Sequence, residues 1–328
     1  MSDKLKKVLK YVFAAALAAV LVYLALKDMD WKVFMSAFGQ TRWGYVALSL
    51  LCALLALIFR VERWHDLMLP INRDIRRIDL WDSCNIGNLL SVAVPWVSLF
   101  VRCGAISDKK TPYDKTLGTI LMERAWDCLM VLLFCILAIF LNTGNIAEWF
   151  YENIAKGLAG RLNLNLGLIF ACLLLLGALF IFLCFKLRKK IPLADKLAGW
   201  IEGIFEGFKS FKEVQHKPRF ILYSVLLWTS YMLMCLCIFH ALPMLSHLGL
   251  SDALFLFTVG NLSSLLPVPG GFGAYHYFVA LALSGLYDVS WEIGILFATL
   301  IHETRSLMLV ALGVLSLLFF QKRRASRG

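Results

Sequence analysis

The sequence predicts an all-α integral membrane protein with about six full transmembrane helices and two re-entrant helical hairpins in an inverted-topology repeat. Three observations indicate this class. Apolar residues make up 60% of the 328-residue chain, whereas soluble domains are usually about 45–50% apolar. Several runs of about 18 residues or more carry little or no charge, which is the length that a bilayer-spanning helix needs. The basic residues, which give a net charge of +11, gather at 60–77, 186–219 and 322–327, as in cytoplasmic loops, and this argues against a nucleic-acid partner.

Six apolar segments are predicted to be full spans: 8–26, 43–60, 115–141, 165–186, 219–242 and 291–320. The first follows several lysines, as a signal peptide would, but its apolar run is too long and no convincing cleavage site follows, so we expect a retained span. The basic N-terminus is expected in the cytoplasm, and the second span then brings Arg60 and Arg63 back to that side. Over 193–215, apolar residues recur at helical spacing with charges between them. This predicts an amphipathic helix on the cytoplasmic surface, with a packed soluble helix as the alternative.

Two more apolar segments, 79–110 and 250–286, contain helix-breaking residues. The first contains Pro95, and the second contains the string PVPGGFG. If each segment enters the membrane and turns back, the second one at 268–271, all basic loops and both termini lie in the cytoplasm. Counting only one of them as a full crossing puts the basic tail outside, and counting both puts the loop 186–219 outside. We therefore predict two re-entrant hairpins, with one proline-kinked span as the alternative for the second; broken backbone at that depth must be buried in protein or line a wet cavity.

The two interrupted segments are similar to each other. IGNLLSVAVP begins at Ile86 and VGNLSSLLPVP at Val259, and each hairpin is followed by a span with ionisable residues, in MERAWD and in HETR. Chance similarity between short apolar strings is the alternative. We interpret the segments as repeat units 79–141 and 250–320 within one polytopic membrane domain, 1–328. Three full spans separate the hairpins, so the units are expected to enter from opposite faces, as in transporters that bind substrate near the midplane.

Ionisable residues in the two charged spans are the first candidates for a substrate site. These candidates are Glu123, Arg124, Asp127, His302, Glu303 and Arg305. Glu123 and Asp127 share a helix face, and Arg124 lies three residues before Asp127. An ionisable residue at the centre of a membrane helix costs about 2.5–3.5 kcal/mol on insertion scales, so such residues pair or face a polar cavity. A pathway for a charged headgroup or a proton and an internal ion pair that holds the repeats together both remain open.

Residues of the hairpins complete the candidate site: Asn88, Arg102, Asn261, Gly270, Gly271 and His276. Asn88 and Asn261 occupy the same repeat position, where each could bond freed backbone groups or contact substrate. A half-helix that begins after the PVPGG tip would present unpaired N–H groups to an anion. His276, early in that half-helix, could add a hydrogen bond or a titrating proton, with a structural role as the alternative. Arg102 is placed similarly in the first hairpin.

Motifs of soluble enzyme chemistry are missing from the sequence. It contains no GxxxxGK[ST], GxSxG or HExxH string, which argues against a P-loop ATPase, an α/β-hydrolase and a zincin. Most of the nine cysteines lie in apolar segments, without CxxC or Cys/His metal spacing, and are expected to be small buried side chains. We therefore expect no catalytic residues, no metal and no cofactor.

The motifs resemble those of the flippase-like membrane-domain family, also named after the transmembrane region of lysylphosphatidylglycerol synthases. The resemblance covers nearly the whole chain and is carried by NLLSVAVP with VRCGAI, by ILMERAWD and by NLSSLLPVPGGFGAY. It implies movement of a lipid headgroup across the bilayer or handling of polyprenyl-linked glycolipids. Two-domain relatives append an aminoacyl-transfer domain; nothing follows Gly328, so we expect no aminoacyl transfer by this chain. Many relatives carry Glu near His276 and a more polar stretch after the first proline than Trp96, Ser98 and Leu99.

The predicted function is translocation of an anionic lipid, a phospholipid or a polyprenyl-phosphate-linked lipid, through a central polar cavity in the inner cell membrane. Arg102, Arg124 and Arg305 would hold the phosphate. The alternative is an integral-membrane enzyme or subunit in lipid-linked sugar or aminoacyl-lipid metabolism, and a third possibility is a non-catalytic membrane partner. Membrane lipids are the expected partners, with a homo-oligomer or a lipid-modifying enzyme as further candidates.

Overall fold

The computed structural model describes residues 16–27, 29–94, 97–141, 179, 182–183, 185–188, 195, 198, 214–263, 266 and 268–325. All regular structure in these ranges is helical, which confirms the all-α part of the prediction. The first predicted span is described as a short apolar helix from Ala16 to Leu26. Nearly all of the predicted span 165–186 and of the predicted surface helix 193–215 lies outside the described residues.

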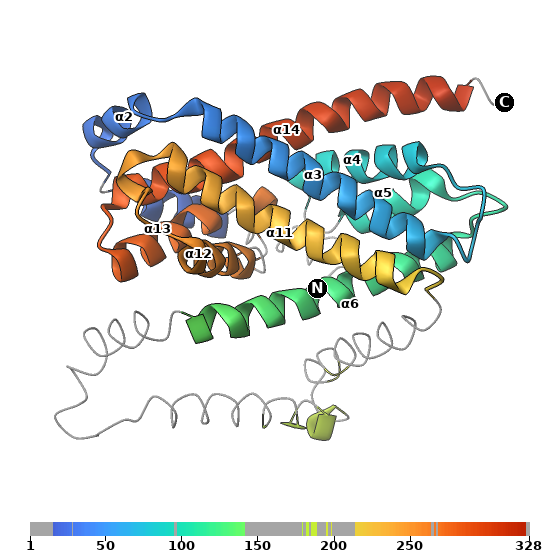
Figure 1. Cartoon of the computed structure of the whole chain (residues 1–328). Helices are drawn as coiled ribbons and strands as arrows, with labels where there is room; N and C mark the ends of the chain where they lie inside the picture. Colours follow the sequence, from blue (N-terminus) through green and yellow to red (C-terminus); the bar gives the residue numbers. More distant parts are fainter. Residues whose placement is uncertain are drawn as a thin grey trace.

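Four described helices are long and apolar enough to cross a membrane: α3 (Trp43–Met68), α6 (Tyr113–Leu141), α11 (Lys217–Ala241) and α14 (Trp291–Ala325). They correspond to four of the six predicted spans. α3 and α11 pack side by side (Figure 1), and the Arg42 amide, just before α3, donates a hydrogen bond of 2.8 Å to the Ala241 carbonyl at the end of α11. Large apolar side chains such as Leu51 and Leu318 stay exposed on α3 and α14, as expected for helices that face lipid.

α3 is longer than the sequence predicted, and this corrects the placement of two arginines. The uncharged run ends before residue 60, so the sequence put Arg60 and Arg63 in a cytoplasmic basic segment. In the structure both lie inside the helix, which continues to Met68, and the Arg63 side chain is fully buried. The helix can continue because carboxylates on α6 meet these guanidinium groups, so the charges are buried in pairs.

The first interrupted segment folds into α4 (Arg77–Ala93) and α5 (Val97–Ile106). With 17 and 10 residues, at about 1.5 Å per residue, neither helix reaches the roughly 30 Å of a bilayer core. The loops before and after this hairpin lie together, since Asn72 Nδ2 donates a hydrogen bond of 2.9 Å to Thr111 Oγ1. The chain therefore enters and leaves the hairpin at the same end of the bundle.

The second interrupted segment folds into α12 (Leu250–Ser263), the 3-10 helix η4 (Pro269–Gly271) and α13 (Ala274–Tyr287). Its turn depends on glycine, because φ is +60° at Gly270, +77° at Gly271 and +80° at Gly273, a region that residues with a Cβ rarely adopt. The ends of this hairpin also lie together, with the ring centroids of Phe255 and Tyr287 6.4 Å apart.

Within each hairpin, the two arms come closest at a glycine, and the two glycines occupy matching positions in the similar sequence strings. A Cβ atom at Gly87 would lie 2.7 Å from Ser98 Oγ and 2.9 Å from Arg102 Cγ. A Cβ atom at Gly260 would lie 2.5 Å from Tyr275 Cε2. Both glycines begin the repeated Gly-Asn-Leu string. The sequence similarity thus falls where each hairpin requires the absence of a side chain.

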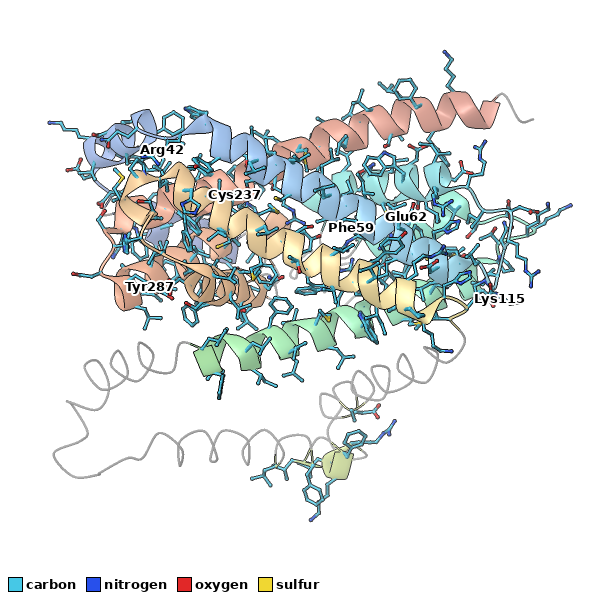
Figure 2. The ribbon with its side chains drawn as sticks, in the orientation of Figure 1. Arg42, Phe59, Glu62, Lys115, Cys237 and Tyr287 are labelled. Carbon is cyan, nitrogen blue, oxygen red and sulfur yellow. The ribbon has the colours of Figure 1, made fainter. Side chains whose placement is uncertain are left out.

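The two hairpins open toward opposite ends of the bundle. α4 follows the short connection after Met68, at the end of α3, whereas α12 follows the short connection after Ala241, which lies beside the start of α3. Figure 2 marks the two ends, with Arg42 and Tyr287 at one and Lys115 at the other.

Between these ends the tips of the two hairpins contact each other. Each hairpin packs one arm on its own long helix and the other arm on the long helix of the other unit. η4 packs on α4, where a Cβ atom at Gly270 would lie 3.4 Å from the Val92 carbonyl oxygen. The returning arm of each hairpin packs on the long helix that follows it, α5 on α6 and α13 on α14. The entering arm packs on the long helix of the other unit, α4 on α14 and α12 on α6. This exchange brings the charged residues of both long helices toward the centre.

Candidate functional site

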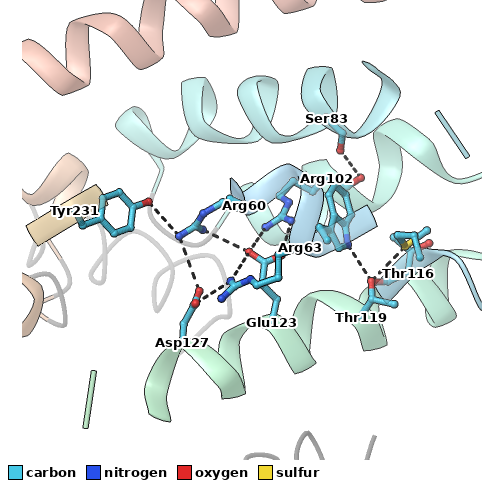
Figure 3. A network of polar contacts seen from close by, with 11 residues as sticks. Arg60, Arg63, Ser83, Arg102, Thr116, Thr119, Glu123, Asp127 and Tyr231 are labelled. Atoms are coloured by element: carbon cyan, nitrogen blue, oxygen red, sulfur yellow. Dashed lines mark hydrogen bonds and ion pairs between the residues drawn. The ribbon is translucent and has the colours of Figure 1, made fainter. Parts of the chain in front are cut away.

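A buried carboxylate on α6 organises the largest polar cluster. Glu123 is fully buried and accepts hydrogen bonds from Arg102 of α5, at 2.7 Å from Nη2 and 3.3 Å from Nη1. Two guanidinium groups from α3 reach the same carboxylate, Arg60 at 3.5 Å and Arg63 at 3.6 Å. Figure 3 shows these guanidinium groups, from α3 and α5, converging on Glu123 of α6. Sequence analysis selected Arg102 and Glu123 separately, and the structure pairs them.

Asp127, one turn further along α6, extends the cluster. Its carboxylate lies 2.8 Å from Arg63 Nη2 and 3.9 Å from Arg60 Nη2. Glu123 and Asp127 therefore share both arginines of α3, as their i,i+4 spacing allows. Within the described ranges Asp127 faces these arginines, whereas Arg124 lies on the exposed side of α6 with its charge still close enough to interact with both carboxylates.

The cluster contains more positive than negative groups. Arg60, Arg63 and Arg102 contact two carboxylates, and Arg124 lies next to Glu123 in the sequence on the exposed side of α6. Nε, Nη1 and Nη2 of the buried Arg63 have no hydrogen-bond partner among the described residues, although Nη2 lies at ion-pair distance from Asp127. Uncompensated buried charge and unbonded N–H groups are both costly. The cluster therefore carries an excess of positive charge, and Arg60 and Asp127 are its partly exposed members, with side chains 17% and 13% exposed.

An aromatic residue of α11 links this cluster to the last helix. Arg60 Nη2 lies 3.4 Å from the Tyr231 hydroxyl, to which it donates a hydrogen bond. The guanidinium carbon of Arg305 lies 5.2 Å from the centroid of the same ring, within the range of cation–π attraction. Arg305 therefore sits next to the first cluster through Tyr231, and the two charged spans are connected by side chains.

The second charged span forms a smaller cluster beside the η4 turn. Glu303 Oε1 lies 2.9 Å from His302 Nδ1 and 3.3 Å from His276 Nε2. The rings of Tyr275 and His302 are stacked, with centroids 5.1 Å apart. A Cβ atom at Gly271 would lie 3.3 Å from His302 Nε2, which places the tip directly against this group. His276 and Glu303, both selected from the sequence, thus lie together.

Other predicted site residues lie outside the two clusters. Asn261 Nδ2 donates a hydrogen bond of 2.8 Å to the Phe257 carbonyl, the backbone role that the sequence left open. Asn88 is half-buried on α4, and no side-chain hydrogen bond of it is found within the described part of the chain. Gly270 belongs to the turn that contacts α4 rather than to a charged cluster.

Sequence reasoning missed three members of the first cluster. Arg60 was predicted as the last residue of the span 43–60 and Arg63 as part of the basic segment after it, but their i,i+3 spacing puts them on one helix face, and this signal could have been read. Tyr231 gave no signal, because an aromatic residue in an apolar span is usually a packing residue.

Comparisons with known proteins identify the family of the chain. No curated protein and no solved structure matches it. The model of the family described as lysylphosphatidylglycerol synthase TM region matches residues 11–313. This match covers nearly the whole chain and agrees with the helices that are long and apolar enough to span a membrane. The chain therefore belongs to the lysylphosphatidylglycerol synthase TM region family, as a membrane-embedded, multi-pass protein of a family linked to lipid metabolism or transport.

Proposed function

We propose that the protein moves an anionic lipid across the membrane and that the headgroup passes through the arginine cluster, consisting of Arg60, Arg63, Arg102 and Arg124. One observation carries this proposal: the guanidinium groups of Arg60, Arg63 and Arg102 contact two carboxylates within apolar helices, and Nε and Nη1 of the buried Arg63 lack hydrogen-bond partners among the described residues. A phosphate would neutralise the excess charge and accept the free N–H groups in charge-assisted hydrogen bonds.

The proposed topology has six full spans, two re-entrant hairpins and both termini in the cytoplasm of a cell with an inner membrane. The units 79–141 and 250–320 form the inverted repeat. Support comes from hairpins that open toward opposite ends, from tips that touch, and from close arm contacts at Gly87 and Gly260. An arrangement with twofold character suits access from either face, and midplane sites between such units are common in transporters.

In the proposed mechanism the acyl or polyprenyl chains stay in lipid while only the headgroup enters the protein. Arg124, on the exposed side of α6, makes the first contact, and Arg60 draws the phosphate toward the buried groups. Glu123 and Asp127 hold the guanidinium groups in place when no headgroup is present. Tyr231 and Arg305 continue the polar path toward the second unit.

The test compares two exposed basic residues of α6 in reconstituted vesicles. Arg124→Gln removes a guanidinium from the cluster, and Lys115→Gln removes a charge from the far end of the same helix as the matched control. Movement of fluorescent phosphatidylglycerol from one leaflet to the other is measured by reduction of the outer label with an impermeant reagent. We expect Arg124→Gln to slow this movement at least about tenfold, because a hydrogen bond to a charged group contributes about 1.5–3 kcal/mol.

Lys115→Gln should leave the rate unchanged, and fluorescent phosphatidylcholine should move more slowly than the anionic lipid. Wild-type vesicles that move no anionic lipid faster than protein-free vesicles would contradict the proposal. Such a result would favour an integral-membrane enzyme or subunit that handles a lipid-linked substrate in the same cluster.

A further inference from the structure

The second charged cluster contains a ligand set that lipid movement does not require. One atom each from His276, His302 and Glu303 lies within 4.8 Å of the other two, and this is the group of possible metal ligands found among the described residues. His276 belongs to α13, and the other two residues belong to α14. All three are partly buried, so the site lies inside the bundle rather than on an exposed acidic surface.

The distances within this group match those around one bound ion. Ligand atoms about 2.0–2.2 Å from a tetrahedral or octahedral ion lie about 3–4 Å apart from each other. Glu303 Oε1 lies 3.3 Å from His276 Nε2 and 2.9 Å from His302 Nδ1. Two imidazole nitrogens and one carboxylate oxygen form a frequent ligand set for zinc when one position stays open. The same set also suits Fe²⁺ and other first-row ions.

The directions of the side chains support a common target. Adjacent residues in a helix project about 100° apart and do not normally face each other. His302 and Glu303 are adjacent, but their polar atoms converge at 2.9 Å. His276 reaches the same carboxylate oxygen from a different helix. Three side chains from two helices thus turn toward one point.

Charge balance also distinguishes this cluster from the first one. Glu123 is paired with arginines, whereas no Lys or Arg occurs from Ile221 through Thr304, and Arg305 lies over the Tyr231 ring. Glu303 therefore takes its nearest partners from imidazoles, which are neutral unless protonated. A divalent cation would supply the positive charge that arginine supplies in the first unit.

We propose that His276, His302 and Glu303 bind one divalent transition-metal ion, with Zn²⁺ as the best match to the donor set. The ion keeps an open coordination position for water or for an oxyanion. Gly271 of the hairpin tip lies against His302, so the ion stands beside the turn where α13 begins. Metal binding at this place does not depend on lipid movement, and either proposal can fail alone.

The experiment measures the metal content of the full chain, purified in detergent without a polyhistidine tag. After removal of metal with a chelator, Zn²⁺ is added, and bound zinc per chain is determined by mass spectrometry of the dialysed protein. We expect one ion per chain. Co²⁺ in place of Zn²⁺ should give the visible absorption of a low-coordinate site without the strong near-ultraviolet band of thiolate ligands, which excludes the cysteines as ligands.

His302→Gln and Glu303→Gln should each weaken zinc binding at least about tenfold, since even loss of an outer partner of a metal ligand costs about 10–100-fold in affinity. His247→Gln is the matched control, because this histidine is exposed outside the cluster; it should bind zinc as wild type does. Gel filtration checks that each variant is folded. Wild-type protein that binds no stoichiometric zinc overturns the proposal even if a variant fails to fold, and so does His302→Gln protein with unchanged affinity.

Discussion

The two hairpins each place a carboxylate of a long helix against a residue of the returning arm, but the partners of the two carboxylates differ. In the first, the carboxylate of Glu123 meets Arg102 on the returning arm and two more arginines from α3. In the second, the carboxylate of Glu303 meets His276 on the returning arm and its own neighbour His302. The difference teaches that similar hairpin contacts can hold a carboxylate in two ways, because the residue type decides whether the partner's charge is permanent, as in arginine, or conditional, as in histidine.

The largest effect on stability is expected when the carboxylate of Glu123 is removed, and a much smaller one when that of Glu303 is removed. Glu123→Gln leaves several buried guanidinium groups without their main counter-charge, so we expect a loss of about 3–5 kcal/mol in the free energy of unfolding. Glu303→Gln, in metal-free protein, leaves two imidazoles that can be neutral, and Glu303 is 27% exposed, so we expect a loss of about 1 kcal/mol or less. Thermal unfolding in detergent measures both, and equal losses would contradict the distinction.

Much of this fold could be predicted from the sequence, but not the composition of its sites. Long apolar runs predicted α3, α6, α11 and α14. The glycines of PVPGGFG predicted a turn, and the structure has positive φ angles at three of them. The extension of α3 was not predicted, because Arg63 becomes acceptable inside a helix only when Glu123 and Asp127 arrive from α6. Such pairing depends on tertiary contacts between helices, and the hydropathy of a single segment gives no information about these contacts.

The same limit applies to the second cluster. His276 and His302 lie on two helices, and metal-binding patterns with short spacing do not apply to them. Arg60 and Tyr231 likewise meet only because α3 and α11 pack side by side.

A middle-sized effect concerns the matching glycines at the arm contacts. Gly87→Ala and Gly260→Ala should each lower the free energy of unfolding by about 1–3 kcal/mol, because the added Cβ lies under 3 Å from its neighbour and forces the arms apart. Gly104→Ala is the matched control in α5, where a Cβ meets nothing within 4 Å and alanine is favoured over glycine by about 1 kcal/mol in a helix interior. Chemical denaturation in mixed micelles would compare them. Destabilisation of only one of the two variants would show that the hairpins are less alike than their contacts indicate.

An effect of similar size on stability, with a larger one on function, is expected at the turn of the second hairpin. Gly271→Val forces a branched side chain into a φ of +77° beside His302, and such strain costs on the order of 1–3 kcal/mol. We expect the variant to insert and stay folded but to lose movement of anionic lipid in vesicles. Gly39→Val, with open space around its Cβ position, is the control. Unchanged lipid movement by Gly271→Val protein would show that the tip takes no part in the mechanism. The difference between the two units would then lie in their charged clusters alone.

The packing of the first hairpin on the long helix of the second unit has a consequence for biogenesis. α4 packs on α14, and roughly 200 residues separate them, which a ribosome needs roughly 10–40 s to add at about 5–20 residues per second. During that interval α4 and α5, which carries the buried Arg102, have been synthesised but cannot yet contact α14. The packing of the first hairpin is therefore completed only after α14, the last described helix, has been synthesised.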